Sequence, residues 1–431
     1  MKTWKTLALT SLFLTFGSLS LHAQDDDGSP GLEQRDIEAL RDWINTKRQV
    51  TVKERGGNLS ISGEVRTELQ STNEKKNGIQ QRGWRSANSG TAMRAWDIEV
   101  NLMLDYRTDR TWATVKLEFD NDAGTVSGTF NRLSLERAFF GGRIVNADLY
   151  TMDLEFGRRF LNYTFDSKIQ FGSFMDGILF KYDHALQSIG DLYFHGGPFL
   201  VNEHFDHYAY VGELGLLNIG GTGLYSKLSF INWDTKNYKG KTRPSKDEKL
   251  TSSERARLYN LAFDFRNLQL TLGYKFVPDW LWKKITTVYA AGLFNTAARP
   301  HEMTDNMKQA FAWYAGFSIG ELRKQWDWSF DVNYQWVQAQ AIPDFDGSGI
   351  GRGNAAKIGL YSTKSKGEGT PTTRHTAVGA GNYKGLSVEL LYNLTNNITV
   401  YQAWRQSVNY TTAIGPAFSY KQYEIELIYA F

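Results

Sequence analysis

The stretch Gln422–Phe431 reads QYEIELIYAF and alternates with a period of two. One face carries Tyr423, Ile425, Leu427, Tyr429 and Phe431, and the other carries Gln422, Glu424 and Glu426. Such a period is the signature of a β-strand whose two faces meet different environments. An apolar face with aromatic residues near both ends, opposite a charged face, is typical of a strand that separates lipid from a wet lumen. The stretch therefore predicts a membrane β-barrel, with an edge strand of a soluble sandwich as the alternative.

Alternation of this kind begins at Asn58 and continues along the chain. The alternating segments number 16 if Arg255–Phe276 is one long strand that changes phase at a bulge near Arg266. If that segment is two strands, a further strand within 355–383 brings the count to 18. Because closure removes the edges that a long open sheet must protect, we predict an all-β fold. It is a transmembrane antiparallel β-barrel of 16 strands, with 18 as the alternative.

The connections between these strands alternate between short and long. Tight turns fall at 108–110 and 395–397, whereas 234–253 and 338–384 are long. Long loops at one end and tight turns at the other are typical of outer-membrane barrels. Within the last loop, DFDGSG at 344–349 lacks the glutamate that an EF-hand needs at its twelfth position, and we interpret it as a flexible extracellular loop.

The N-terminus carries an export signal. Lys2 and Lys5 precede the uncharged apolar run Leu7–Leu21, and Ala23 supplies a small residue at a cleavage point. Farther on, apolar residues recur at helical spacing within Leu32–Lys53, which predicts a short periplasmic helix. The predicted organisation is a signal peptide at 1–23, a periplasmic leader and helix at 24–57, and the barrel at 58–431.

Composition limits the chemistry. The 431 residues include no cysteine, so disulfides and thiolate metal sites are excluded. The formal net charge is +3, which provides no field to attract nucleic acid. A mean hydropathy of −0.44 with 14% aromatic residues fits a barrel whose strands average an apolar and a wet face.

The first three strands present ionised side chains as one complete face. We predict that this face lines the lumen, because the opposite face of each strand is apolar. The lumen-facing residues assigned in this way are Glu64, Arg66, Glu68, Glu99, Asn101, Asp105, Lys116 and Glu118.

A basic group surrounds one of the longer loops. Arg158, Arg159 and Lys168 bound the loop 159–174, in which Asp166 is the one acidic residue. Fixed charges at a constriction set ion selectivity, so we predict that this loop folds inward and that its three cations form the constriction. The alternatives are an ordinary surface loop here and a constriction formed by 71–93 or 338–384.

Several motifs resemble a known family. Gly320–Trp328 (GELRKQWDW) joins a basic turn to a Trp-x-Trp pair, and Ala339–Phe345 (AQAIPDF) leads into an acidic, glycine-rich loop. Leu386–Leu394 with its Asn396-Asn397 turn, and EFGRRF at Glu155–Phe160, extend the pattern. In these motifs the chain resembles a porin family of Gram-negative outer membranes that is related to the phosphate-selective porins.

The final strand adds a second resemblance. Alternation that ends on Phe431 is similar to the assembly signal of outer-membrane β-barrels, and we assign Tyr429 and Phe431 to that signal. Together the resemblances imply a passive diffusion channel for small hydrophilic solutes and ions in the cell outer membrane. They imply no enzymatic activity, no cofactor and no metal. The implied partners are outer-membrane lipid, the barrel-assembly machinery, small hydrophilic solutes and further copies of the chain in a homotrimer; nucleic acid is not among them.

Two other functions remain open from the sequence. In the first, residues 24–57 plug a gated uptake channel for a specific or apolar ligand. In the second, the barrel is an outer-membrane enzyme, which needs a histidine converging with a serine or an acid. The six candidate histidines outside the signal peptide are His184, His195, His204, His207, His301 and His375.

Overall fold

The computed structural model describes residues 50–54, 57–83, 92–120, 132–202, 207–234, 265–300, 304, 306–343, 346–351, 381–413 and 417–431. These residues form strands, with short 3-10 helices at η1 (Leu161–Tyr163), η4 (Asp279–Leu281) and η6 (Gly349–Gly351). The strands are β1 (Val50–Glu54), β2 (Gly57–Lys76), β3 (Ile79–Gln80), β4 (Arg94–Arg107), β5 (Thr111–Asp120), β6 (Arg132–Asn146), β7 (Tyr150–Phe160), β8 (Phe174–Leu186), β9 (Gly190–Asn202), β10 (His207–Ile219), β11 (Leu224–Asp234), β12 (Arg266–Phe276), β13 (Thr286–Asn295), β14 (Phe311–Ile319), β15 (Trp328–Val337), β16 (Tyr383–Asn393), β17 (Ile398–Asn409) and β18 (Phe418–Ala430).

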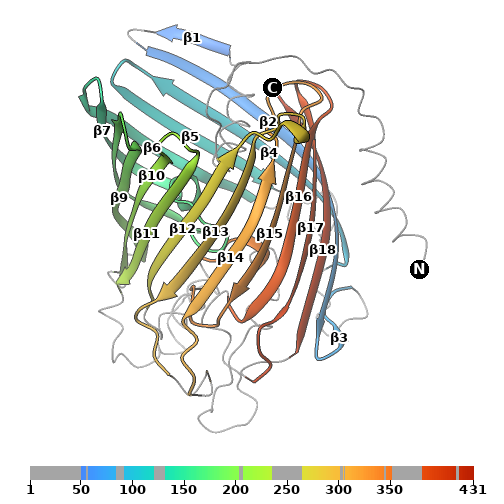
Figure 1. The fold of residues 1–431 in the computed structure, drawn as a ribbon. Helices are drawn as coiled ribbons and strands as arrows, with labels where there is room; N and C mark the ends of the chain where they lie inside the picture. The colour runs from blue at the N-terminus through green and yellow to red at the C-terminus, as the bar shows by residue number, and fades with distance from the viewer. Residues whose placement is uncertain are drawn as a thin grey trace, which may run out of the picture.

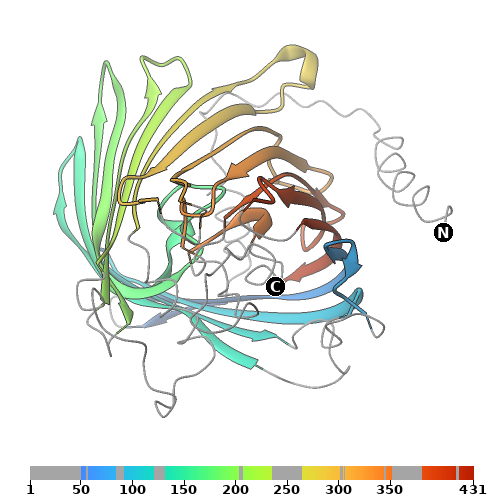
Figure 2. The same ribbon diagram turned by 90° about the horizontal axis from the view of Figure 1, so that it is seen from below.

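The sheet closes on itself. Consecutive strands pair antiparallel from β4 to β18, and β2 joins β18 on one side to β4 on the other. Of the 18 strands in the described part of the chain, β1 and β3 pair only with β2, so 16 strands form the ring. Figure 2 looks along the ring from one end. The prediction of a 16-stranded antiparallel barrel is confirmed.

The two rims of the barrel differ as the connection lengths predict. The connections 108–110, 147–149, 187–189 and 394–397 lie at one rim, together with the end of β18, and this rim is called the turn rim below. At the opposite rim, called the loop rim, longer connections such as 161–173, 296–310 and 338–382 join the strands (Figure 1). The longest connections therefore lie at the loop rim.

Strand β12 shows most clearly how the two faces differ. Leu268, Leu270 and Leu272 are 42–52% exposed, whereas Asn267 and Gln269, which alternate with them, are fully buried. In an ordinary soluble protein the polar residues would be outside and the leucines inside. The reversed arrangement indicates a barrel with an apolar outer face and a polar inner face. No helix in the described ranges combines the length and the apolar character needed to cross a membrane.

The predicted N-terminal helix lies largely outside the described residues, as does the predicted signal peptide. Residues 50–53, the last residues of the predicted helix, belong to β1 instead, so the predicted end of the helix is wrong. The backbone of Val50 pairs with Ile61 and that of Val52 with Leu59. Because β-branched residues favour an extended backbone and a neighbouring edge is available on β2, strand pairing replaces the helix at this point.

The core lies inside the ring, on one side of it. Two clusters of buried apolar side chains lie on the inner faces of β8–β11 and β13–β16, and one of them reaches β18 through Phe418 and Tyr420. Both clusters contain residues of the connection between β7 and β8, namely Ile169 in one and Leu161, Phe165 and Phe171 in the other. The loop 161–173 therefore enters the barrel and packs against part of its wall.

Candidate channel lining

The inward loop, residues 161–173, is held by polar contacts to strands on the far side of the ring. Ser167 Oγ donates to Gln269 Oε1 on β12 over 2.8 Å, and Asn267 Nδ2 on the same strand donates to Gln170 over 3.2 Å. Gln335 Nε2 on β15 lies 3.4 Å from the carbonyl oxygen of Lys168. Contacts to strands about 100 residues later in the chain show that this segment spans the interior.

A buried ion pair anchors the middle of this loop. The ammonium group of Lys227, which is fully buried on β11, lies 3.0 Å from Asp166 Oδ2. Beside it, the fully buried carboxylate of Glu213 accepts hydrogen bonds from the main-chain N–H of Asp166 and from the hydroxyls of Tyr193 and Ser229. Because a buried charge is tolerated only when it is paired and hydrogen-bonded, this network fixes the position of the loop.

Lys168 forms a second anchor. Its ammonium group lies 3.0 Å from Asp331 Oδ1 on β15. The same carboxylate accepts hydrogen bonds from Tyr289 and Asn333. The charge of Lys168 is therefore neutralised by the wall against which it packs.

A second segment folds inward over the first. Asp346 is fully buried, and its carboxylate accepts hydrogen bonds from the N–H of Phe171 at 3.2 Å and the hydroxyl of Ser173 at 2.8 Å. The backbones also meet, because Gly172 N–H donates to the Asp346 carbonyl and a Cβ at residue 172 would lie 2.3 Å from the Gly347 carbonyl oxygen. Burial raises the pKa of Asp346 to about 7, although these hydrogen bonds act to lower it. We call this contact the Asp346 latch.

The interpretation of DFDGSG as a flexible extracellular loop is wrong for the residues from Asp346 onward. Its described part, 346–351, packs inside the barrel against the inward loop, where Ser348 N–H donates to the carbonyl of Ile169. The buried carboxylate of Asp346 and the close approach of Gly349 to Lys168, whose carbonyl oxygen would lie 2.3 Å from an added Cβ, account for the composition of the described part of this stretch without a metal ion.

The three cations predicted at the constriction do not meet. Strand β7 continues to Phe160, so Arg158 and Arg159 are neighbours within a strand and point to opposite faces. Arg158 lies in phase with the outer face and pairs with Asp176, and both side chains are more than 40% exposed. Arg159 faces inward, where it is bound to Glu155 over 2.7 Å. Only Arg159 and Lys168 lie inside the barrel, and each has a carboxylate partner.

The eight residues assigned to the lumen all lie in the inward phase of β2, β4 and β5. Their local partners differ. Glu64 binds Arg66 and accepts a hydrogen bond from Asn101, and Glu64 and Asn101 are almost buried. Lys116 pairs with Glu136 on β6, and Asp105 accepts a hydrogen bond from Thr114. Side-chain exposures of 17% for Arg66 and 25% for Glu99 leave part of this wall open to water.

The residues assigned to the assembly signal lie on the outer face of β18. Tyr429 and Phe431 are 49% and 45% exposed and alternate with buried Ile428 and Ala430. The backbone of Phe431 pairs with Gly63 on β2, next to the register pair Ala430 and Glu64. These two aromatic side chains therefore lie on the outside of the junction where the ring closes.

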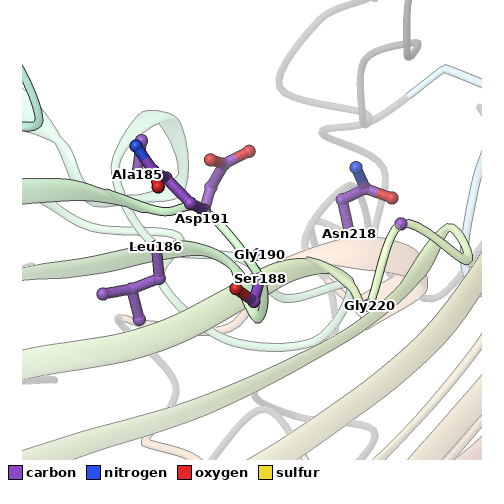
Figure 3. A pocket seen from close by; sticks show the side chains of 9 residues that line it. Ala185, Leu186, Ser188, Gly190, Asp191, Asn218 and Gly220 are labelled. Carbon is purple, nitrogen blue, oxygen red and sulfur yellow. The ribbon is translucent and has the colours of Figure 1, made fainter.

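A small hollow lies at the turn rim, between the β8–β9 and β10–β11 turns (Figure 3). Its volume is about 320 Å³, and Asp191 is its one charged lining residue. A single carboxylate among turn residues forms no catalytic or metal-binding constellation.

Sequence reasoning missed the residues that hold the loop. Lys227 occupies an ordinary alternating strand, LYSKLSFINWD, and nothing in this pattern identifies its partner. The sequence offers one signal for these anchors, the isolated charge of Asp166, which is the one acidic residue of the loop. Glu213 and Asp346 carry no comparable signal, because their partners are distant in the chain.

Comparisons with known proteins give structural likeness without sequence likeness. No family model and no curated protein matches the chain. Three solved structures illustrate the structural likeness. OprB of Pseudomonas putida shares 9% identity over 86% of this chain and 94% of that chain, with a TM-score of 0.48. The outer membrane channel DcaP of Acinetobacter baumannii shares 11% identity over 88% and 99%, with a TM-score of 0.47. Salmonella typhi OmpF shares 11% identity over 89% and 100%, with a TM-score of 0.46.

Proposed function

We propose that this chain is an outer-membrane porin, a passive diffusion channel for small hydrophilic solutes and ions. The observation that carries the proposal is the closed ring of 16 strands with apolar side chains outside and ionised side chains inside. Barrels of about this strand number are wide enough to enclose an aqueous channel. Closure also satisfies the backbone hydrogen bonds that lipid could not.

The inward loop gives this channel its size limit. It occupies the side of the lumen next to β8–β16 and leaves the charged wall from β17 through β2 to β7 on the other side. Arg405 on that wall keeps a side-chain exposure of 19%, and Glu389 on the adjacent β16 keeps 25%. Solutes would pass between the loop and this hydrated wall, without a strong binding site, because conduction requires that they leave again.

The remaining parts of the proposal extend beyond the barrel itself. The sequence motifs favour a porin family related to the phosphate-selective porins, and residues 1–23 favour export through a signal peptide. In that setting lipid surrounds the outer face, the barrel-assembly machinery inserts the chain, and three copies associate. The many carboxylates on the wall do not favour phosphate as the solute.

Planar-bilayer recording tests the channel directly. Folded, purified protein should give steps of ionic conductance, and liposomes that contain it should swell with small neutral sugars and fail to swell with large ones. Folded protein that gives neither conductance nor swelling would overturn the proposal.

A deletion separates the porin from a plugged uptake channel. Removing residues 24–49 spares β1, and a porin should keep its conductance unchanged. A large rise in conductance after the deletion would instead favour the plug function of the leader.

A further inference from the structure

The outer face of the barrel carries three lysines close to the loop rim, in the sector formed by β16, β17, β18 and β2 (Figure 1). Lys75 on β2 and Lys384 on β16 lie in one row of paired residues, which runs through Ser419 and Val408. Lys421 on β18 follows Ser419 by two residues, toward the turn rim. Lys75 and Lys421 are exposed and Lys384 is half-buried. We call Lys75, Lys384 and Lys421 the lysine patch.

The period of two places these side chains on the outer face. Each lysine lies an even number of residues from an exposed leucine of its own strand, namely Leu69, Leu386 or Leu427. Because successive side chains alternate between the faces of a strand, the lysines point outward with the leucines. Tyr423 and Trp404 form the next outward row toward the turn rim. The lysine patch therefore borders aromatic side chains of the kind that mark a membrane–water interface.

The height of the lysine patch fits that interface. Lys421 and Tyr429 lie eight residues apart on β18, and Lys75 lies ten residues from Val65, which pairs with Tyr429. At about 3.3 Å per residue and a tilt of about 35–45°, these separations span about 19–27 Å along the membrane normal. The apolar band of such barrels is about 25 Å tall. With Tyr429 at one edge of the band, the lysines reach the headgroups at the other edge.

No carboxylate balances the lysine patch from the outer face. The outward residues of β16, β17, β18, β2 and β4 in the described ranges include no aspartate or glutamate. In the same part of the chain, no side chain forms an ion pair or hydrogen bond with the three ammonium groups. Glu74, next to Lys75 in sequence, faces inward and binds Arg82 over 2.8 Å. The adjoining connections 77–93 and 410–417 contain no acidic residue in their sequence.

Arg158 provides the contrast on the same outer face. Its guanidinium group lies 2.7 Å from the carboxylate of Asp176 on the neighbouring strand, so that charge is neutralised within the protein. The ammonium groups of the lysine patch lie at the level of the lipid headgroups without such a partner. The complementary negative charge is available there from the membrane.

We propose that the lysine patch binds the phosphate groups of anionic lipids in the leaflet at the loop rim. The proposal rests on the membrane placement in the proposed function and not on conduction. A lysine stem lies along apolar surface while its ammonium group reaches a charged headgroup, so one lipid can contact both the leucines and the lysines. A second copy of the chain that presented the same face would instead bring like charges together.

Native mass spectrometry of the folded barrel in nonionic detergent, titrated with phosphatidic acid, tests the proposal. The wild type should bind phosphatidic acid more tightly than phosphatidylcholine with the same acyl chains. The triple variant Lys75→Gln, Lys384→Gln, Lys421→Gln should bind phosphatidic acid about tenfold to a hundredfold more weakly, since each lysine near an anionic surface adds to the attraction. The single variant Lys421→Gln should show a smaller loss and serves if the triple variant folds poorly.

The matched control removes three positive charges at the opposite rim. Arg110, Lys283 and Lys324 are exposed at the turn rim, and their triple change to glutamine should leave the affinity for phosphatidic acid nearly unchanged. An equal loss in this control, a patch variant that binds as tightly as the wild type, or equal binding of phosphatidylcholine would overturn the proposal.

Two further outcomes separate the alternatives. A patch variant that changes oligomeric state while it keeps the wild-type affinity for phosphatidic acid would overturn the proposal and assign this face to a second copy of the chain. Planar-bilayer recording tests the porin proposal independently. A folded wild type that binds phosphatidic acid through the lysine patch but gives no conductance would overturn the porin proposal and support the lipid site.

Discussion

Phe431 and Gly63 exchange both of their main-chain hydrogen bonds, N–H of each to the carbonyl of the other, over 2.9 and 3.1 Å. The Phe431 ring also covers the space next to Gly63. A Cβ added at residue 63 would lie 2.6 Å from the ring and 2.7 Å from the carbonyl oxygen of Asn101 on β4. The main-chain pairing of Phe431 with residue 63, which helps to close the ring, therefore depends on residue 63 having no side chain.

We predict that Gly63→Ala and deletion of Phe431 both impair insertion into the membrane while export to the periplasm continues. Each change disturbs the junction between β18 and β2, the first by steric conflict and the second by removing two hydrogen bonds. The fraction of folded barrel in isolated outer membranes measures the effect.

Gly142→Ala is the control for this pair. A Cβ at residue 142 would meet its nearest atoms at ordinary distances of 3.6 and 3.7 Å. Normal membrane yield of both junction variants would show that this junction does not limit assembly.

We predict that Val100→Arg, on the outer face at the centre of β4, lowers folding stability by about 2–4 kcal/mol, the usual result of placing arginine near the bilayer midplane. Glu99→Gln next to it should change stability little, because Glu99 faces water. Asn101 is a poor inner-face control, since it is 3% exposed and donates to Glu64. Equilibrium folding titrations into lipid vesicles measure the difference, and equal losses at 99 and 100 would contradict the assignment of the faces.

We predict that Lys227→Met releases the inward loop. The change leaves Asp166 without its buried cation, and breaking such a pair costs about 3 kcal/mol or more. Single-channel records should then show larger and noisier currents.

The double variant Lys227→Met, Asp166→Asn removes both charges of the pair and should recover part of the wild-type behaviour. If the single variant conducts as quietly as the wild type, the ion pair does not hold the loop.

We predict that the Asp346 latch weakens as pH rises. When the latch opens, water restores the Asp346 carboxyl to its ordinary pKa of 3.8, whereas the closed latch has a pKa of about 7. A raised pKa in the closed state means that the latch is most stable below 3.8, loses stability as pH rises toward 7, and changes little above that.

Protease cleavage near residue 346 at a series of pH values checks this dependence. Cleavage should increase up to about pH 7 and then level off, within the roughly one-unit spread of such pKa values. In Asp346→Asn, which stays neutral and can still accept from Phe171 and Ser173, the pH dependence should disappear. An unchanged profile in this variant would exclude Asp346 as the titrating group.

The faces of the strands could be predicted from sequence, because alternation is a local property. Glu68 and Val100 were assigned to opposite faces from their neighbours alone, and the barrel closes with that assignment. The prediction for Arg158 was wrong for an equally local reason. It ended β7 too early and so placed Arg158 in a loop with Arg159. The strand continues to Phe160, so the two side chains point to opposite faces.

The contacts that position the loop could not be predicted in this way. Asp346 lies 175 residues from Phe171, and Lys227 lies 61 residues from Asp166. Side chains at such separations are brought together by closure of the whole ring, and no periodicity in either segment encodes the partner. An inward loop was therefore foreseeable from its charges, but its anchors were not.

Strand β1 has a mechanical consequence for the ring. It occupies the edge of β2 at 57–61, and β18 occupies the same edge from Glu64 to Lys76. A sheet that slips by two residues keeps every side chain on its proper face, so alternation alone does not forbid such a slip. With β1 already in place, β18 cannot slide toward the turn rim without displacing it. The first strand of the chain thus acts as an end stop that fixes the stagger of the last.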